Sequence, residues 1–150
     1  MSGSQHEDYL TRQVRAIAAM LARMVGLRTS GEDAEAKAEL AKAYGLLFGP
    51  QAELLRRVDT RTVATLLNSE DRILALAQLF NEEAEQDKDV TQSKTWRVRA
   101  VELGIEVTRR DPENETARHF LKALAPVVDR QQLTPQQRAI LDESLGLPST

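Results

Sequence analysis

The sequence predicts an all-α fold, and three observations support this prediction. Ala, Leu, Glu and Arg dominate the 150 residues, and these residue types favour helices. Aromatic residues make up only 4%, and the β-branched and aromatic types that strands favour are scarce. Apolar residues also recur three and four positions apart, as they do on one side of an amphipathic helix.

The chain has the length of one ordinary domain. Its hydrophobic content of 41% is sufficient for a core without a metal ion or disulfide bonds. We expect residues 1–6 to be disordered and residues 7–147 to form a single domain. Within that domain we expect antiparallel helical hairpins with about seven helices in all.

A long amphipathic helix is expected over residues 7–27, because apolar and charged positions separate onto two sides there. Its apolar side contains Leu10, Val14, Ile17, Leu21, Met24 and Val25. A second helix follows a polar break at residues 28–31, and small residues on its inner side favour close approach of the two helices. The expected inner side contains Ala34, Ala38, Ala41, Tyr44, Leu47 and Phe48.

Two short helices are predicted next. Gly49 and Pro50 end the second helix, since glycine terminates helices and proline cannot continue the hydrogen-bond ladder. One short helix follows directly, and another begins at Asp59 or Thr60. Asn68 is expected to cap the longer helix that comes after them.

Two longer helices are predicted over residues 69–86 and 92–110, with a polar connector between them. The second of these has two apolar stripes on nearly opposite sides of the helix. One stripe contains Trp96, Ala100, Leu103 and Val107, and the other contains Val98, Val101 and Ile105. A helix that is apolar on two sides is expected to have neighbours on two sides.

The C-terminal helices have clear start and stop signals. An Asp-Pro pair at residues 111–112 ends the preceding helix, Asn114 opens the next, and Pro126 ends or kinks it. Thr134 and Gln137 are spaced as a capping box, which predicts the start of a last helix.

Tetratricopeptide-type repeats are helical hairpins of about 34 residues with small residues where the two helices cross. The helices over residues 69–110 fit such a hairpin, with Ala100 and Gly104 at positions of close approach. The characteristic repeat motif is absent from the first helix of the pair, and no second copy of the hairpin occurs in the chain.

Three features extend this comparison to residues 7–112. They are the opening segment "EDYLTRQV", the segment "DTRTVATLLNSEDRILALAQLFNEEAE", and a helix that ends in Asp-Pro. With these features the chain resembles an uncharacterised family of small bacterial tetratricopeptide-like helical proteins. The resemblance implies a helical hairpin fold without assigned catalytic residues. Residues 113–147 carry no such resemblance and are expected to add C-terminal helices.

Charge and composition exclude several classes of function. The formal net charge of −3 gives no general attraction to nucleic acid. The absence of cysteine excludes a disulfide framework, a thiolate zinc site and a cysteine nucleophile. No apolar run approaches the roughly 18 residues of a membrane span, and the first residues lack the pattern of a secretion signal. We therefore expect a cytoplasmic protein that binds no nucleic acid.

No histidine or calcium motif predicts a metal site. His119 has Glu115 one helical turn before it, but no third ligand is apparent. Residues 87–98 begin like a calcium loop, yet Gln92 and Val98 stand where glycine and glutamate are needed.

No catalytic set is apparent either. The acidic residues Glu82, Glu83 and Glu85 lack the Glu-x-x-His element of di-iron sites. A solvated face, with some of these carboxylates paired to Lys88, Lys94 or an arginine, is the favoured interpretation. The chain is therefore expected to have no enzyme activity, no cofactor and no metal.

Arginines and the single tryptophan form the candidate interaction surface. The arginines gather on the first helix and around the two short helices, where they can bind an acidic partner segment, although a solubilising face is the favoured interpretation. Trp96 is in register with Ala100 and Leu103, which favours a place in the core over an interface. The candidate surface contains Arg12, Arg15, Arg23, Arg28, Arg56, Arg57, Arg61 and Trp96.

The favoured function is non-catalytic protein–protein interaction, as an adaptor or scaffold with an unidentified protein partner. Homodimer formation through the first or the last helix is expected to complete the helical array. Two alternatives stay open: a regulatory domain with a small-ligand pocket between helices, and peripheral membrane association through the first helix.

Overall fold

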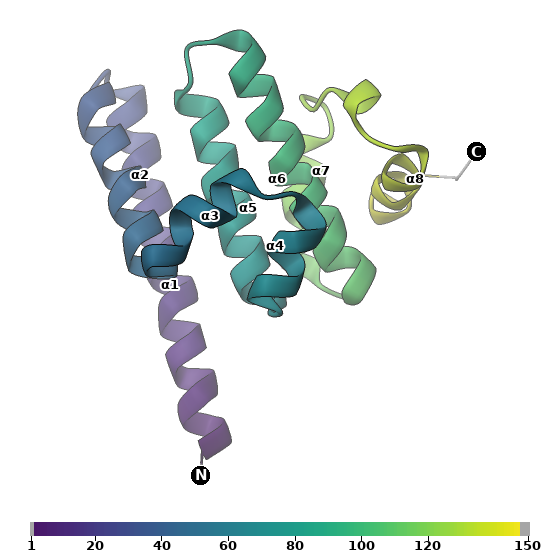
Figure 1. Cartoon of the computed structure of the whole chain (residues 1–150), viewed down its shortest axis with the longest axis horizontal. Helices are drawn as coiled ribbons and strands as arrows, with labels where there is room; N and C mark the ends of the chain where they lie inside the picture. The colour runs from purple at the N-terminus through teal and green to yellow at the C-terminus, as the bar shows by residue number, and fades with distance from the viewer. Residues whose placement is uncertain (1, 148–150) are drawn as a thin grey trace. The chain divides into compact units, whose positions relative to one another are not determined.

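A computed structural model describes the backbone of residues 2–147 and the side chains of residues 12, 13 and 15–147. These residues form helices and no strand, which confirms the all-α prediction (Figure 1). The α-helices are α1 (Ser2–Thr29), α2 (Asp33–Phe48), α3 (Ala52–Arg57), α4 (Thr60–Leu67), α5 (Glu70–Gln86), α6 (Val90–Arg110), α7 (Glu115–Leu124) and α8 (Pro135–Ser144). The 3₁₀ turns are η1 (Gly49–Gln51) and η2 (Arg130–Gln132).

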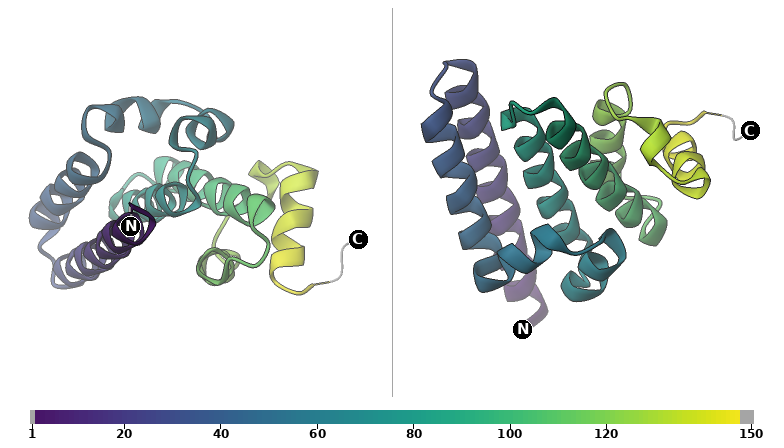
Figure 2. Two further views of the ribbon diagram at one scale, coloured as in Figure 1. Left: turned by 90° about the horizontal axis from the view of Figure 1, so that it is seen from below. Right: turned by 45° about the horizontal axis from the view of Figure 1, so that its top comes forward.

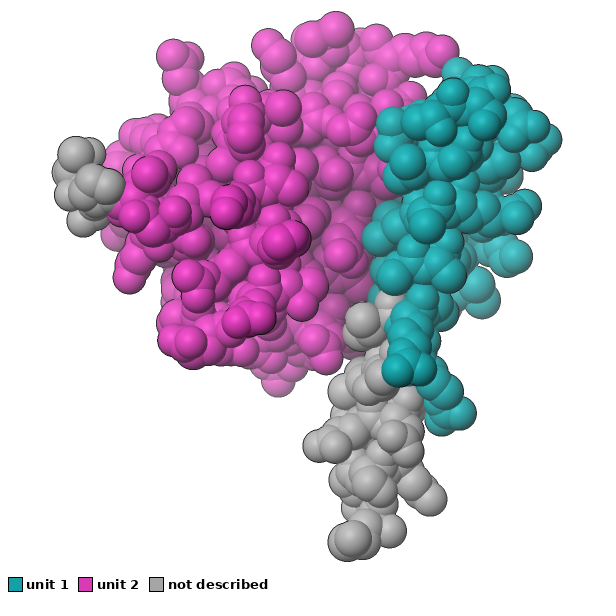
Figure 3. Space-filling model, turned by 180° about the vertical axis from the view of Figure 1, so that it is seen from behind, with its two compact units in different colours: residues 1–56 teal, residues 57–150 magenta. Residues whose placement is uncertain are grey.

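The chain divides into two compact units, which Figure 3 shows in different colours. Unit 1 is Met1–Arg56 and unit 2 is Arg57–Thr150. The single domain over residues 7–147 stays a prediction. The disorder of residues 1–6 also stays a prediction, because Met1 and the side chains of residues 2–6 lie outside the described part of the structure.

Unit 1 is built on a hairpin of α1 and α2, which lie side by side (Figures 1 and 2). Ile17 and Met24 of α1 are buried, as their place on the predicted apolar side requires, whereas Leu10 and Val14 lie outside the described side chains. Arg23 of α1 forms an ion pair with Glu39 of α2 at 3.1 Å. This pair connects the two helices at the surface of the hairpin.

The predicted inner side of α2 is wrong in part. Tyr44 and Phe48 are buried, but Ala34, Ala38 and Ala41 are exposed. The buried small residues are instead Ala36 and Ala43, with Leu40 between them. Alanines occur on every side of α2, so apolar spacing alone could not identify the side that packs. The large residue Leu40 marks the buried side.

The end of α2 follows its sequence signal. Gly49 has a positive φ of 55° and its N–H bonds to the carbonyl of Gly45, as a helix-terminating glycine does. Pro50 then begins a short 3₁₀ turn that leads into α3. The predicted short helix after Gly49 and Pro50 is thus confirmed.

The short helix α4 begins at its predicted cap. The Asp59 carboxylate accepts a hydrogen bond from the N–H of Thr62 at 2.7 Å. The predicted cap of α5 is wrong by one residue, because Asn68 ends α4 in the left-handed conformation, with φ of 46°. Ser69 caps α5 and accepts a hydrogen bond from the N–H of Arg72.

The core of unit 2 is the pair α5 and α6, which lie side by side (Figure 2). Helix α6 begins at Val90, two residues earlier than predicted, because Asp89 caps it through the N–H of Gln92. Helix α6 also packs against α4, α7 and α8, so both of its apolar stripes are covered. Its buried residues are Val98, Ala100, Val101, Leu103, Gly104, Ile105, Val107 and Thr108. The prediction that α6 has neighbours on two sides is confirmed.

Gly104 is a point of close approach, but between α6 and α7 and not between the two helices of the predicted hairpin, α5 and α6. A Cβ atom at Gly104 would lie 2.8 Å from Cδ2 of Leu121 and 3.2 Å from Cδ2 of Phe120. Leu121 is fully buried, so its side chain has little space into which to move. Only glycine allows the two helices to approach this closely.

The C-terminal helices begin as their sequence signals predict. The Asn114 side chain accepts from the N–H of Ala117 at 3.0 Å and starts α7. Thr134 and Gln137 form the predicted capping box at the start of α8. Helix α7 ends at Leu124, two residues before Pro126.

Replacing Gly104 and Gly45 by alanine should change stability in opposite directions. Gly45 lies in α2 with open space around it, so Gly45→Ala should raise the free energy of unfolding by about 0.5–1 kcal/mol through helix propensity. Gly104→Ala should lower the free energy of unfolding by about 1 kcal/mol. The added methyl group would collide with Leu121, and this cost exceeds the gain in helix propensity. Urea denaturation of the two variants measures both changes. A stabilised Gly104→Ala protein would show that Leu121 is free to move.

Candidate functional site

Trp96 packs inside unit 2 and is half-buried. Its ring lies against Phe80 of α5, with 5.1 Å between ring centroids and an angle of 55° between the planes. Aromatic pairs prefer such tilted arrangements, because the ring edge of one meets the ring face of the other. Trp96 therefore links α6 to α5, as expected of the predicted core residue, but it keeps part of its surface accessible.

Arg99 covers this aromatic pair. Its guanidinium carbon lies 4.5 Å from the ring centroid of Phe80 and 5.2 Å from that of Trp96. The same guanidinium donates a hydrogen bond to the carbonyl of Val58, directly after α3, at 2.7 Å. A carbonyl at a helix end has no intrahelical partner, so Arg99 supplies one and also contributes cation–π attraction. These contacts give Arg99 a structural role.

The acidic residues at the end of α5 do not share one environment. Glu85 is paired with Arg97 of α6 at 2.8 Å, which confirms the prediction that an arginine meets this run. Glu82 is only 4% exposed and accepts a hydrogen bond from Gln86 at 3.0 Å. The expectation that all three carboxylates lie on a solvated face is therefore wrong for Glu82, because this residue is on the side of α5 that packs.

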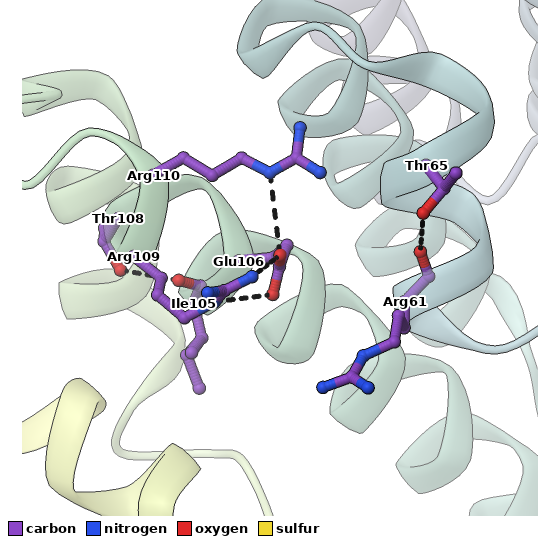
Figure 4. A network of polar contacts seen from close by, with 7 residues as sticks. All are labelled: Arg61, Thr65, Ile105, Glu106, Thr108, Arg109 and Arg110. Carbon is purple, nitrogen blue, oxygen red and sulfur yellow. Dashed lines mark hydrogen bonds and ion pairs between the residues drawn. The ribbon is translucent and has the colours of Figure 1, made fainter.

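A second polar network lies at the end of α6 (Figure 4). The Glu106 carboxylate accepts two hydrogen bonds from Arg109, and its ion pair with Arg110 has an N···O distance of 3.6 Å. Figure 4 also shows Arg61, which projects from α4, and α4 packs against α6. We call Arg61, Arg109 and Arg110 the arginine cluster.

The network changes the acidity of its members. Hydrogen bonds from Arg109 are the main cause that lowers the pKa of Glu106 below its ordinary value, and the charges of Arg109 and Arg110 act in the same direction. The hydrogen bond to Glu106 raises the pKa of Arg109. The lowered pKa favours the ionised form of Glu106. Within the arginine cluster, this carboxylate pairs with Arg109 and Arg110.

The structure distributes the predicted interaction surface over both units. Arg12, Arg15 and Arg23 are exposed on α1, and Arg23 is paired with Glu39. Arg28 and Arg56 are half-buried; Arg56 is paired with Glu53, and its guanidinium carbon lies 5.2 Å from the ring centroid of Tyr44.

Arg57 and Arg61 belong to unit 2, where both are exposed. Arg109 and Arg110 were not among the predicted residues, although two adjacent arginines at the end of a predicted helix could have indicated them. Of the predicted arginines, Arg61 is the one on a helix, α4, that packs against α6, which carries Arg109 and Arg110.

No three side chains of His, Asp or Glu among the described residues are grouped as a metal site requires. His119 and Glu115 are both exposed on α7. The segment that begins like a calcium loop is helical from Val90 onward, and Asp89 is engaged as the cap of α6. The geometry of a calcium loop is therefore not formed there.

Comparisons with protein-family models, with curated proteins and with solved structures find no match to this chain. None of the helices in the described part of the chain is both long enough and apolar enough to cross a membrane.

The Glu106 network should contribute to stability in a pH-dependent manner. The folded-state pKa of Glu106 is lowered, so its contribution is present above the unfolded pKa and is lost as pH falls through the folded pKa. Urea denaturation of the wild type and of Glu106→Gln should show a stability difference at neutral pH that shrinks below the ordinary glutamate pKa of 4.5. Glu113→Gln, at an exposed position in the turn after α6, controls for the loss of one negative charge. A difference that is constant with pH would contradict this role.

Removing the charge of Arg99 should destabilise unit 2. Arg99→Met keeps an apolar stem over the Phe80 ring but loses the hydrogen bond to Val58 and the cation–π contact. We expect a loss of about 1–3 kcal/mol in the free energy of unfolding. Arg118→Met, at an exposed position on α7, should be neutral to within about 0.5 kcal/mol. Equal effects of the two substitutions in urea denaturation would refute the structural role of Arg99.

Proposed function

We propose that this protein is a non-catalytic adaptor that binds an acidic segment of another protein through the arginine cluster. The observation that carries the proposal is the excess of positive charge at the end of α6. Three guanidinium groups are present, and Glu106 is the carboxylate that pairs with two of them.

Arg61 makes no side-chain hydrogen bond or ion pair within the described part of the chain, and it is exposed. Asp59 and Asp111, which flank these helices, accept hydrogen bonds from backbone N–H groups at helix ends. Each of these carboxylates thus has a backbone partner, and the charge of Arg61 also contributes to the lowered pKa of Asp59. Guanidinium groups bind carboxylates with two parallel hydrogen bonds, which makes an acidic peptide a suitable ligand.

The helix that carries Arg109 and Arg110 is firmly packed, which suits a binding surface. Arg109 and Arg110 occupy the last turn of α6, whose preceding turns are buried in unit 2. The pair α5 and α6, followed by α7 after the Asp111–Pro112 turn, supports a tetratricopeptide-like arrangement, and the resemblance to the bacterial tetratricopeptide-like family is part of the same proposal. Helical hairpins of this type commonly present helix surfaces to peptides.

Charge reversal tests this function. The wild type and Arg61→Glu, each carrying an affinity tag, are used to capture proteins from a lysate of the source organism at low and high salt. We expect a partner whose retention falls at least tenfold with Arg61→Glu and weakens as salt is added, because the attraction is screened. Arg118→Glu makes the same charge change at an exposed position on α7 and should retain the partner. A partner that is retained equally by both variants would exclude the arginine cluster as its binding site.

A further inference from the structure

The exposed side of α1 carries positive charge and no negative charge of its own. Between Asp8 and Glu32 the sequence contains four arginines and no aspartate or glutamate. Among the described side chains of α1, the exposed ones belong to Arg, Ala, Val, Gly and Thr. We use the name α1 surface for the exposed residues Arg12, Arg15, Ala18, Ala22, Arg23 and Val25.

Helix α2, which packs against α1, has the ordinary pattern of a solvated helix. Its exposed charged residues have both signs, namely Asp33, Glu35, Lys37 and Lys42. Opposite charges that alternate along a helix are typical of a face that meets only water. The α1 surface lacks this alternation, so a partner of opposite charge suits it better than water alone.

The ion pair with α2 leaves much of this charge accessible. Glu39 of α2 pairs with Arg23, but the side chain of Arg23 is still 64% exposed, whereas that of Glu39 is 17% exposed. The carboxylate therefore approaches from the packed side of the hairpin. The guanidinium of Arg23 keeps its outer side open to a second anion.

Apolar residues run beside the arginines. Ala18, Ala22 and Val25 are spaced by four and three residues, which places them in one row along α1. Arg15 is three residues before Ala18, and Arg28 is three residues after Val25, so an arginine adjoins each end of the row. The large apolar residues of α1, such as Ile17 and Met24, are buried on another side. The row is consequently shallow, with Val25 42% exposed.

We propose that the α1 surface lies flat on a bilayer that contains anionic lipids. A helix rich in arginine, with apolar residues beside the charges, binds in the plane of such a surface. Guanidinium groups form two parallel hydrogen bonds with a phosphate, and their long apolar stems reach past the small residues of the row to the headgroups. From Arg12 to Arg28 the helix axis extends about 24 Å, so several lipid phosphates come within reach together.

The chemistry of the row favours a bilayer over a protein partner. Interfaces between proteins usually centre on a few large side chains, and the apolar members of the α1 surface are two alanines and a valine. A negatively charged bilayer needs no such anchor, because its attraction acts on every arginine near it. This inference does not depend on the arginine cluster, which belongs to unit 2.

The first test is co-sedimentation of the full chain with vesicles. The vesicles contain phosphatidylcholine alone, or equal parts of phosphatidylcholine and phosphatidylglycerol. We expect partitioning onto the anionic vesicles that is at least tenfold stronger than onto the neutral ones. It should be lost as salt rises from about 0.05 M to about 0.5 M, because salt screens the attraction. Equal partitioning onto both kinds of vesicle, or none onto either, would overturn the proposal.

Charge variants locate the surface. Arg15→Glu should weaken partitioning at least tenfold while circular dichroism shows an unchanged helix content, and Arg15→Lys should keep most of it. Arg118→Glu makes the same charge change on α7 and should bind vesicles as the wild type does. Arg61→Glu should also bind them, although it removes the site of the proposed function, so the two proposals can fail separately. Equal weakening by Arg15→Glu and either of these controls would refute a role for the α1 surface.

Soluble anions distinguish a bilayer from other sources of negative charge. Poly-glutamate and inorganic phosphate, each added at the same ionic strength as a sodium chloride control, should displace the protein from anionic vesicles no more than the control does. A protein that binds poly-glutamate through Arg15 and leaves the vesicles would have an acidic protein segment as its partner. Displacement by inorganic phosphate alone would indicate a site for the free ion. Either result would contradict the bilayer proposal.

Discussion

Burial of α6 on several sides is the constraint on which the rest of unit 2 depends. Fully burying one large aliphatic side chain contributes about 1.5–3 kcal/mol, whereas an exposed ion pair contributes about 0–1 kcal/mol. Helix α6 buries residues of both its stripes against α4, α5, α7 and α8. The positions of these neighbours therefore follow from α6. The ion pairs on its surface, such as that of Glu85 with Arg97, adjust an arrangement that the apolar contacts have already determined.

The same helix positions the polar groups of unit 2. Arg99 extends from α6 at the edge of the buried region, where its guanidinium contacts two rings and the carbonyl of Val58. Arg109 and Arg110 leave it in the last turn, beyond the buried stripes. Helix α6 thus carries the structural residue Arg99 along its length and two members of the arginine cluster, Arg109 and Arg110, in its last turn. A binding surface on such an element loses little conformational freedom when a ligand binds.

Local signals made most of the fold predictable. The caps at Asp59, Asn114 and Thr134 depend on residues within three positions of each other, so the sequence contains the whole interaction. The two apolar stripes of α6 could also be predicted from the sequence, because large apolar residues alternate with charged ones along this helix. The cap of α5 was misplaced by one residue, since Asn68 and Ser69 can both serve and the left-handed φ of Asn68 decides between them.

The candidate site was less predictable, because its members are on two helices, α4 and α6, that are related only through packing. Nothing in the sequence relates Arg61 to Arg109, which are separated along the chain by the whole of α5 and most of α6.

The buried side of α2 was predicted wrongly in part, and the amino-acid composition of this helix explains why. Alanine adds little area to a core, so a helix with alanines on every side gives no strong preference for the side that packs. Unit 1 ends at Arg56 and has a single hairpin, and chains of that length bury a smaller fraction of their surface than longer chains do. The side of α2 that packs is therefore determined by its large residues Leu40, Tyr44 and Phe48.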